Sequence, residues 1–310
     1  MTHAIAGQRV LLTGASGFLG RHLSARLAAG GAEVHGVSRA ARTSPDGSPR
    51  WWQADVEDLE ATRQLMSEVK PDRIVHLGGA VNGAPELGLV VATYHSLVTT
   101  TVNLLQVAAE IGCGRVVLVG SLEEPEASAE AVRATSPYGA AKWAASVYGR
   151  MFHDLFRVPV VIARTHMAYG PGQPTWKVIP STILSLLRGE APRLSSGRRS
   201  LDWVYVDDVV EGLLAVATAP DIEGATVELG SGRLTSIRDV VSMLVPLIAP
   251  GVTPVFGALA DRPRGDERPA DVTRTRTLTG WEPRTSLEAG LIRTVEWYRH
   301  RHIVGEGSER

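Results

Sequence analysis

The chain has 310 residues, enough to bury a large core and to form either one two-lobed unit or two closely joined domains. Apolar residues make up 44% of the chain and charged residues 21%. The net charge of −1 produces no overall positive potential that would attract nucleic acid or an anionic membrane. The single cysteine, Cys113, excludes an internal disulfide framework and a cysteine-rich metal site. The N-terminal residues hold no apolar signal core and no apolar run reaches membrane-spanning length, so we expect a cytoplasmic protein.

The first expected elements are a strand, a glycine turn and a helix. Residues 9–13 are an apolar run, glycines stand at 14, 17 and 20, and residues 21–29 have helical spacing. Glycines in this context permit a tight turn, let backbone N–H groups approach a diphosphate, and let the helix pack closely on the strand. The diphosphate then lies at the positive end of the helix. We therefore predict that a dinucleotide contacts Gly14, Ser16, Gly17, Phe18 and Leu19.

The end of the second expected strand, residues 33–37, indicates whether the cofactor carries a 2′-phosphate. An acidic residue at this strand end would bind the adenosine ribose and repel a 2′-phosphate. Here the strand ends at Ser38 and Arg39, with Arg42 close behind. A hydroxyl and two guanidinium groups suit a phosphate dianion, so we predict NADP(H), with NAD(H) as the alternative. The opposing interpretation is two solvated loop arginines.

Two further strands are expected at residues 52–56 and 73–77. Asp55 either accepts a hydrogen bond from the adenine amino group or caps the following helix. His76 is interpreted as a buried histidine at the core edge rather than a catalytic group. After the strand at 73–77, the small residues Gly78, Gly79 and Ala80 would allow the cofactor to lie against the backbone. The predicted cofactor contacts from these strands are Asp55, Val56, Leu77, Gly78 and Gly79.

A long helix over 87–111 and a fifth strand over 115–119 complete the first half. Strands that alternate with helices predict an α/β fold with a doubly wound parallel sheet. Ligands of such sheets bind outside the carboxyl ends of the strands. We find no internal repeat and no cluster of His, Asp or Glu with the spacing of a metal site.

The catalytic prediction centres on Ser121, Tyr138 and Lys142. Ser121 follows the fifth strand, at the edge where ligands bind. Tyr138 and Lys142 are four residues apart on one expected helix and so share a face. A nearby ammonium favours the phenolate, which would let the Tyr138 phenol exchange a proton with a substrate hydroxyl or carbonyl near neutral pH.

With these residues in place, nearly the whole chain resembles the extended short-chain dehydrogenase/reductase family of nucleotide-sugar epimerases, dehydratases and ketoreductases. The resemblance rests on TGASGFLG at 13–20, Ser121, SPYGAAK at 136–142, the stretch 163–173, WVYVDDVV at 203–210 and LGSGRLTSIRDVV at 229–241. It implies a Rossmann fold with a smaller C-terminal substrate lobe. It also implies that the Ser binds the reacting sugar oxygen, the Tyr is the acid/base, and the Lys holds the nicotinamide ribose and lowers the Tyr pKa.

The resemblance also implies a substrate lobe. Residues 177–187 resemble the helix along the nucleotide, and 197–207 resemble the segment with a diphosphate-binding arginine before Asp202. That position is Leu201 here, so either Arg198 or Arg199 substitutes or the diphosphate is held elsewhere. A late arginine that reaches the diphosphate is expected at Arg262 or Arg264. The implied substrate contacts are Glu123, Met167, Lys177, Val178, Arg198, Arg199, Arg262 and Arg264.

Three departures from the family pattern bear on function. Thr165-His166-Met167 replaces Pro-Phe-Asn, which reshapes the sugar pocket and places His166 by the cofactor. Leu97 stands where an Asn is common. Leu122-Glu123 replaces the Asp-Glu pair of the 4,6-dehydratases, which removes their general acid, although Glu123 could still enolise a ketone.

The expected organisation is an NADP-binding domain of 1–168 plus about 203–230, a substrate lobe of 169–202 plus about 231–299, and a polar tail at 300–310. The expected activity is NADPH-dependent reduction of a keto-deoxysugar on a nucleoside diphosphate, for example a dTDP-4-keto-6-deoxyhexose. A redox-neutral NAD-dependent epimerase or dehydratase stays open, as does an inactive NADP-sensing module.

A homodimer is also implied by the resemblance, through the helices at 87–111 and 137–156. The candidate contacts are Leu97, Leu104, Leu105 and Ala108 on the first helix and Trp143, Val147 and Met151 on the second. The alternative is that these side chains face the chain's own core.

Overall fold

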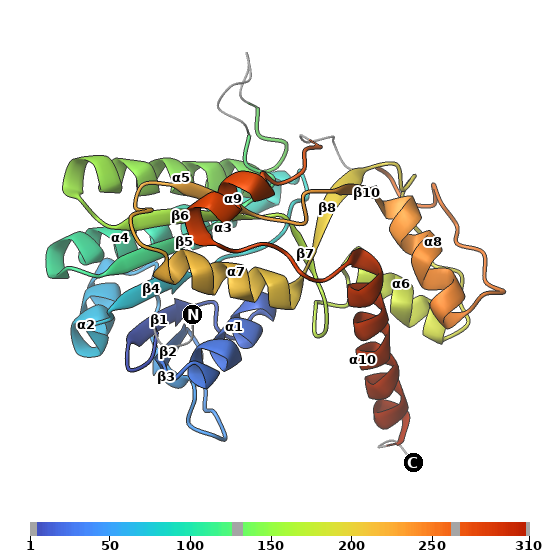
Figure 1. The fold of residues 1–310 in the computed structure, drawn as a ribbon, viewed down its shortest axis with the longest axis horizontal. Helices are drawn as coiled ribbons and strands as arrows, with labels where there is room; N and C mark the ends of the chain where they lie inside the picture. The colour runs from blue at the N-terminus through green and yellow to red at the C-terminus, as the bar shows by residue number, and fades with distance from the viewer. Residues whose placement is uncertain (1–4, 126–132, 262–266, 308–310) are drawn as a thin grey trace. The chain divides into compact units, whose positions relative to one another are not determined.

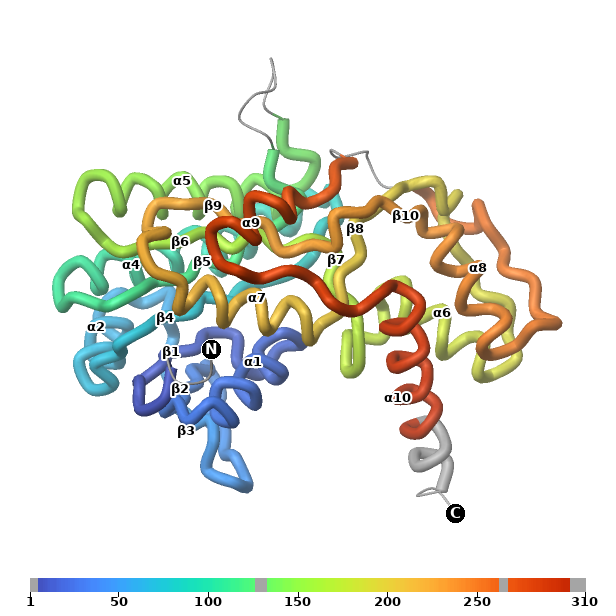
Figure 2. The backbone as a smooth tube through the Cα atoms, viewed as in Figure 1, coloured from blue at the N-terminus to red at the C-terminus, as the bar shows by residue number. Residues whose placement is uncertain are grey.

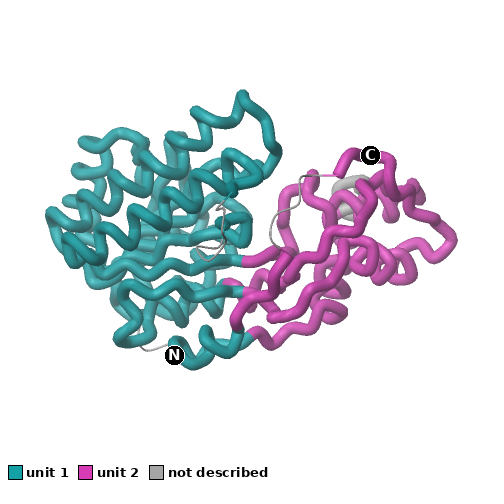
Figure 3. Tube along the Cα trace, turned by 90° about the horizontal axis from the view of Figure 1, so that it is seen from above, with its two compact units in different colours: residues 1–165, 210–229, 272–282 teal, residues 166–209, 230–271, 283–310 magenta. Residues whose placement is uncertain are grey.

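A computed structural model describes residues 5–125, 133–261 and 267–307 (Figure 1). The chain divides into two compact units, shown in two colours in Figure 3. The first unit holds residues 1–165, 210–229 and 272–282. The second holds residues 166–209, 230–271 and 283–310.

The first unit is built on a seven-stranded parallel sheet with the order β3-β2-β1-β4-β5-β6-β9. This confirms the predicted doubly wound α/β fold. The strands are β1 (Arg9–Thr13), β2 (Glu33–Ser38), β3 (Arg50–Gln53), β4 (Arg73–His76), β5 (Arg115–Ser121), β6 (Val160–Thr165) and β9 (Thr226–Leu229).

Helices cover both faces of this sheet (Figure 1). On one face α2 (Leu59–Val69), α4 (Thr100–Ile111) and α5 (Pro137–Phe156) bury apolar side chains against the strands. On the other face α1 (Phe18–Ala29) is tied to α7 (Val206–Thr218) by the Arg26–Glu211 ion pair. The strands are apolar along their length because both sheet faces are covered.

The segment expected as one helix over 87–111 is divided into four parts. A 3₁₀ turn, η2 (Leu87–Leu89), leads to α3 (Val90–Thr93), and a π-helical stretch, η3 (Tyr94–Thr99), precedes α4. The expectation that no segment reaches membrane-spanning length is wrong, because Leu87–Ile111 is long and apolar enough by length and composition. Its second half packs in the core of the first unit, where Leu104 and Leu105 are fully buried. We therefore interpret it as a core helix.

Within its described residues, the second unit contains a three-stranded sheet of order β10-β8-β7 and three helices. Strand β7 (Met167–Tyr169) is parallel to β8 (Ser200–Tyr205), and β10 (Leu234–Ser236) is antiparallel to it. The helices are α6 (Val178–Leu187), α8 (Ile237–Ile248) and α10 (Leu287–Gly307). Helix α10 continues to Gly307, into the residues predicted as a polar tail. It is the last labelled element along the chain in Figure 2.

The unit boundaries differ from the predicted ones in three segments, the shortest of which, 166–168, belongs to the second unit. Residues 203–209 belong to the second unit because β8 pairs with β7 and β10 and not with the seven-stranded sheet. Residues 272–282 belong to the first unit because α9 (Val272–Thr279) packs on β9, where the Thr275 hydroxyl donates to the Glu228 carbonyl at 2.8 Å. Contacts between segments distant in sequence, which local sequence does not encode, decide both of these assignments.

Candidate active site

The catalytic edge lies at the carboxyl end of β5, where the strand delivers Ser121. Helix α5 begins shortly afterwards because Ser136 caps it: its hydroxyl accepts from the backbone N–H of Gly139 at 3.0 Å. Pro137 follows at the first helical position, where its missing N–H costs nothing. The cap fixes the start of the helix and therefore the positions of Tyr138 and Lys142.

The structure brings Ser121, Tyr138 and Lys142 together, all buried. The Ser121 hydroxyl is hydrogen-bonded to the Tyr138 phenol. The Lys142 ammonium donates to the carbonyl of Val119, two residues before Ser121, at 2.6 Å. One helix and one strand end therefore present a hydroxyl, a phenol and an ammonium at one edge.

The predicted lowering of the Tyr138 pKa is wrong for this structure. Burial raises the pKa of Tyr138 well above its usual range, the Ser121 hydrogen bond offsets only part of this, and Glu123 and Glu124 raise it further. Burial also lowers the pKa of Lys142 to about 8, while Glu124 opposes that change. Desolvation outweighs the expected ammonium–phenol effect. Tyr138 is therefore a protonated phenol at neutral pH, which suits it to donate a proton.

His76 occupies the end of β4 as a buried, neutral side chain. Its Nδ1 lies 2.7 Å from the Thr13 hydroxyl and its Nε2 lies 3.4 Å from the Thr100 hydroxyl. Burial, aided by the Lys142 charge, lowers the pKa of His76 to about 3. This agrees with the interpretation of His76 as a core-edge residue.

Two glutamates follow Ser121 and have different environments. Glu123 is half-buried, accepts from the Ser136 hydroxyl at 3.0 Å, and lies against Gly83, where an added Cβ would come within 2.7 Å of a Glu123 oxygen. Glu124 is fully buried and accepts from the Ser121 backbone N–H at 2.7 Å. Glu124 was not predicted as a site residue. The sequence did contain a signal for it, because Glu124 directly follows Glu123 close to the end of the fifth strand.

The glycine turn has the shape that a dinucleotide requires. Gly14 has φ +70°, and a Cβ there would meet the backbone of Gly78 at 2.9 Å. A Cβ on Gly20 would lie 2.0 Å from the Gly14 carbonyl oxygen, so helix and turn need both glycines. Gly17 begins α1 without a side-chain cap and no acidic residue lies in its first turn. The backbone N–H groups of this helix end therefore suit a diphosphate.

The end of β2 carries the predicted basic group. The Arg42 guanidinium donates to the Ser38 hydroxyl at 3.1 Å and lies over the Trp51 ring, and Arg39 is exposed. Asp55 is exposed and accepts from the Glu57 backbone N–H at 3.0 Å. The alternative role of Asp55 as a helix cap is wrong, because Asp58 caps α2.

The remaining cofactor candidates divide between the units. Ser16, Phe18 and Leu19 surround the start of α1, while Val56, Leu77, Gly78 and Gly79 follow β3 and β4, all within the first unit. His166 opens the second unit, where its Nδ1 lies 3.9 Å from a carboxylate oxygen of Asp202. Its contact with the cofactor stays a prediction.

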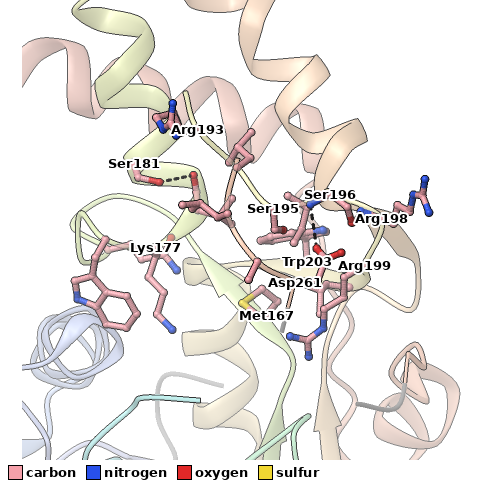
Figure 4. A pocket seen from close by; sticks show the side chains of 18 residues that line it. Met167, Lys177, Ser181, Arg193, Ser195, Ser196, Arg198, Arg199, Trp203 and Asp261 are labelled. Carbon is pink, nitrogen blue, oxygen red and sulfur yellow. Dashed lines mark hydrogen bonds between the residues drawn. The ribbon is translucent and has the colours of Figure 1, made fainter. Parts of the chain in front are cut away.

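The second unit contains a pocket of about 340 Å³. It brings together five of the predicted substrate contacts, namely Met167, Lys177, Val178, Arg198 and Arg199. In Figure 4 the side chains of Lys177 and Arg199 reach the same side of the pocket on either side of Met167, whereas Arg198 extends away. Arg262 and Arg264 lie outside the described residues.

The pocket combines basic, apolar and hydroxyl-bearing walls. Its charged lining residues are Lys177, Arg193, Arg198, Arg199 and Asp261, a net positive set. Asp261 accepts from the backbone N–H of Ser196 at 2.9 Å, and hydrogen bonds with Ser196 and Ser195 lower its pKa (Figure 4). Trp176 and Trp203 add aromatic surface. The sequence did not predict that Asp261, Ser195, Ser196 and the two tryptophans line this pocket. The pocket is assembled from segments far apart in sequence, and only the fold brings them together.

Leu201 also lines this pocket, at the position of the missing arginine. Arg199 precedes it by two residues, which is the spacing of side chains on one face of a strand. The Arg199 Nε is buried and has no hydrogen-bond partner among the described residues. Arg199 is therefore the better placed of the two candidate substitutes.

The predicted dimer contacts on the first helix are wrong. Leu97, Leu104, Leu105 and Ala108 are buried in the chain's own core. Exposed apolar side chains are instead found at Leu87, Val90, Val91, Tyr94 and Ile111, and on α5 at Val147, Tyr148, Leu155 and Phe156. Of the α5 candidates, Val147 is exposed and Trp143 and Met151 are half-buried.

Residues 10–230 match the sequence profile of the NAD dependent epimerase/dehydratase family. The chain is 31% identical to a UDP-glucose 4-epimerase of Mycolicibacterium smegmatis, over 94% of this chain and 99% of that protein. It is 28% identical to a dTDP-D-glucose 4,6-dehydratase of Mus musculus, over 98% and 92%. The structure of MoeE5 in complex with UDP-glucuronic acid and NAD superposes with a TM-score of 0.84 at 29% identity, covering 94% and 99%. Within the described residues no group of His, Cys, Asp and Glu forms a metal site.

Proposed function

The chain belongs to the NAD-dependent epimerase/dehydratase family, and we propose that it is an NADPH-dependent reductase of a keto-sugar carried on a nucleoside diphosphate. The observation that carries this proposal is the buried, protonated Tyr138 beside Ser121 and Lys142. A phenol that keeps its proton at neutral pH is prepared to donate it, which is what ketone reduction requires.

The proposed chemistry is transfer of a hydride to carbon and a proton to oxygen. A bound nicotinamide cofactor supplies the hydride. Ser121 hydrogen-bonds the carbonyl oxygen, Tyr138 gives its proton to that oxygen as the alcohol forms, and the Lys142 charge stabilises the resulting phenolate. The products are an alcohol and the oxidised cofactor, and a proton from solvent restores Tyr138.

Preference for NADPH is proposed from the end of β2. Ser38, Arg39 and Arg42 offer a hydroxyl and two guanidinium groups, and no carboxylate follows the strand to repel a 2′-phosphate. Asp55 is proposed to accept from the adenine amino group. The glycine turn at Gly14 and Gly17 is proposed to hold the diphosphate of the cofactor.

The substrate is proposed to place its nucleoside diphosphate in the pocket of the second unit. The basic side chains of Lys177 and Arg199 suit a diphosphate, and the apolar and aromatic walls suit a base and ribose. MoeE5, 29% identical, is recorded with UDP-glucuronic acid, and its relationship supports a nucleotide sugar as the substrate class.

The proposal is tested by incubating the purified protein with NADPH and a panel of nucleotide keto-sugars while following absorbance at the nicotinamide band. We expect one keto-sugar class to consume NADPH in stoichiometric amount, and NADH to serve poorly. Turnover of a non-keto UDP- or dTDP-hexose without added cofactor would instead establish redox-neutral chemistry.

A redox-neutral epimerase is the second candidate, because the named relatives include epimerases and dehydratases. Dehydration is disfavoured by Leu122, which cannot donate the proton that an Asp at this position would supply. Epimerisation needs neither carboxylate, but it needs the oxidised cofactor to be retained through both half-reactions. Copurification of bound NAD would favour it.

We further propose a homodimer through the exposed apolar residues of α3, η3 and α5. Val91 is 66% exposed, Tyr94 54% and Leu155 68%, and both α3 and η3 contact α5. Large exposed apolar side chains on elements that contact one another suit a protein–protein interface. Light scattering at micromolar concentration should give twice the chain mass, and Val91→Asp should shift it towards the chain mass; a wild-type monomer contradicts the proposal.

A further inference from the structure

A buried carboxylate, Glu124, lies directly behind the catalytic edge. Its side chain is 0% exposed, one oxygen accepts from the Ser121 backbone N–H at 2.7 Å, and its own backbone N–H donates to the Ser121 carbonyl at 3.1 Å. The fit is close, because a Cβ on Gly120 would lie 2.4 Å from the same oxygen. Glu124 therefore holds both backbone groups of Ser121.

The second oxygen of Glu124 is bound by a partly buried cation. Arg164 of β6 donates to it at 3.3 Å, and the other end of the guanidinium donates to Glu228 of β9 at 3.3 Å. Pairing and hydrogen bonding of this kind offset the cost of burying a carboxylate. The pairing links three neighbouring strands at their carboxyl ends.

Glu124 also lies near Lys142, because the Lys142 ammonium donates to the Val119 carbonyl at 2.6 Å while the Glu124 carboxylate lies against Gly120, the next residue of β5, and accepts from Ser121. The titratable and charged groups that face this edge are His76 at the end of β4, Tyr138 on α5, Glu123 and Glu124 after β5, and Arg164 on β6, which pairs with Glu124. His76 is neutral above pH 3 and Tyr138 is protonated, so neither opposes a change at Lys142 near pH 8. Glu124 is the group that raises the Lys142 pKa against the effect of burial.

We propose that Glu124 is a positioning residue that fixes Ser121 through its backbone and holds the Lys142 side chain in its ammonium form. The first role needs a hydrogen-bond acceptor and the second needs a charge, so the two can be separated. The proposal uses the roles that the proposed function gives Ser121 and Lys142. Its test does not depend on the substrate.

The test is a titration of Lys142 in the full chain by NMR. Lys70, Lys142 and Lys177 are the only lysines of the sequence, so ¹³C labelling at the lysine ε-carbon gives a resolvable spectrum, assigned with Lys142→Arg. We expect Lys142 to titrate near pH 8 in the wild type. In Glu124→Gln, which keeps an acceptor for Ser121 but loses the charge, its midpoint should fall by roughly one unit or more.

Glu228→Gln is the matched control, because it removes the other carboxylate on Arg164 without touching Ser121. Its Lys142 midpoint should stay near the wild-type value. A Glu124→Gln protein that titrates like the wild type overturns the proposal, as does an equal shift in both variants, which would indicate only a general loss of buried charge.

If the Glu124→Gln protein does not fold, a second variant tests the proposal. Glu124→Asp keeps the charge but is one methylene shorter, so Lys142 should titrate as in the wild type while the Ser121 amide resonance shifts. An unchanged Ser121 amide, or a Lys142 midpoint that falls as for a lost charge, contradicts the proposal. Because these readouts need no turnover, failure of the reductase assay would leave them unaffected.

Discussion

Ser121, Tyr138 and Lys142 come from one strand end and the helix that follows it, whereas the pocket of the second unit is assembled from segments that span residues 167–261. The catalytic edge is buried and its groups bind one another; the pocket is lined by basic and aromatic side chains, several of them exposed. The difference suggests that the first region carries the chemistry and the second selects the molecule on which it acts. Substitutions should therefore divide into effects on kcat and effects on KM.

Tyr138→Phe should give the largest effect and should fall on kcat alone. The phenol is the proton donor, and a general acid typically contributes roughly 10²–10⁴-fold in rate. Reductase assays should show a loss in that range, while NADPH affinity from fluorescence titration stays within a few-fold. A Phe variant with nearly wild-type turnover would remove Tyr138 from the mechanism.

Arg39→Ala should weaken NADPH binding by about one to two decades and leave NADH nearly unchanged. The estimate follows from the strength of charge-assisted hydrogen bonds to a phosphate. Arg50→Ala is the matched control, since Arg50 lies over the Trp52 ring at the first residue of β3. Equal losses for both cofactors, or a wild-type preference for NADH, would refute the 2′-phosphate assignment.

Arg199→Ala should raise the KM for the nucleotide sugar about tenfold with little change in kcat, because its guanidinium is expected to bind the diphosphate. Arg198→Ala provides the comparison, since the Arg198 side chain extends away from Lys177 and Met167 (Figure 4). If the two variants behave alike, or if Arg199→Ala lowers kcat instead, the pocket does not have this separate role.

The pH dependence should show the smallest effect near neutral pH and should report on the catalytic edge. Lys142 has a pKa of about 8, so its ammonium predominates below that pH and is lost above it. Because this pKa belongs to the enzyme without substrate, kcat/KM should halve near pH 8 and then fall about tenfold per unit. Tyr138 causes no decline in this range because its pKa is raised. A rate that stays flat to pH 10 would show that the ammonium is not required.

The catalytic residues could be predicted because their relationship is local in sequence. Tyr138 and Lys142 share a helix face by spacing alone, Ser136 and Pro137 are recognisable as a helix start, and glycines mark the dinucleotide turn. The parallel sheet followed from the alternation of strands and helices. The Tyr-Lys pair, the helix start and the glycine turn each depend on residues within one or two turns of each other.

What could not be predicted depends on burial and on contacts between distant segments. The Tyr138 pKa moved opposite to expectation because desolvation outweighs the neighbouring charge, and only the fold shows how buried the phenol is. Glu124 accepts a hydrogen bond from Arg164, which is 40 residues away in the sequence. Asp261 accepts one from Ser196, which is 65 residues away in the sequence. Residues 203–209 were predicted in the NADP-binding domain, whereas β8 pairs in the sheet of the second unit, because a strand's own residues do not specify its pairing partners.

The most direct test of the reductase assignment follows the hydride itself. The enzyme is incubated with NADPH carrying deuterium at the transferred position and with the keto-sugar nucleotide that it consumes, and the product is analysed by mass spectrometry. We predict one deuterium on the reduced carbon for each oxidised cofactor released. A product without deuterium, formed while NADPH stays intact, would contradict net reduction and would identify the chain as a redox-neutral enzyme.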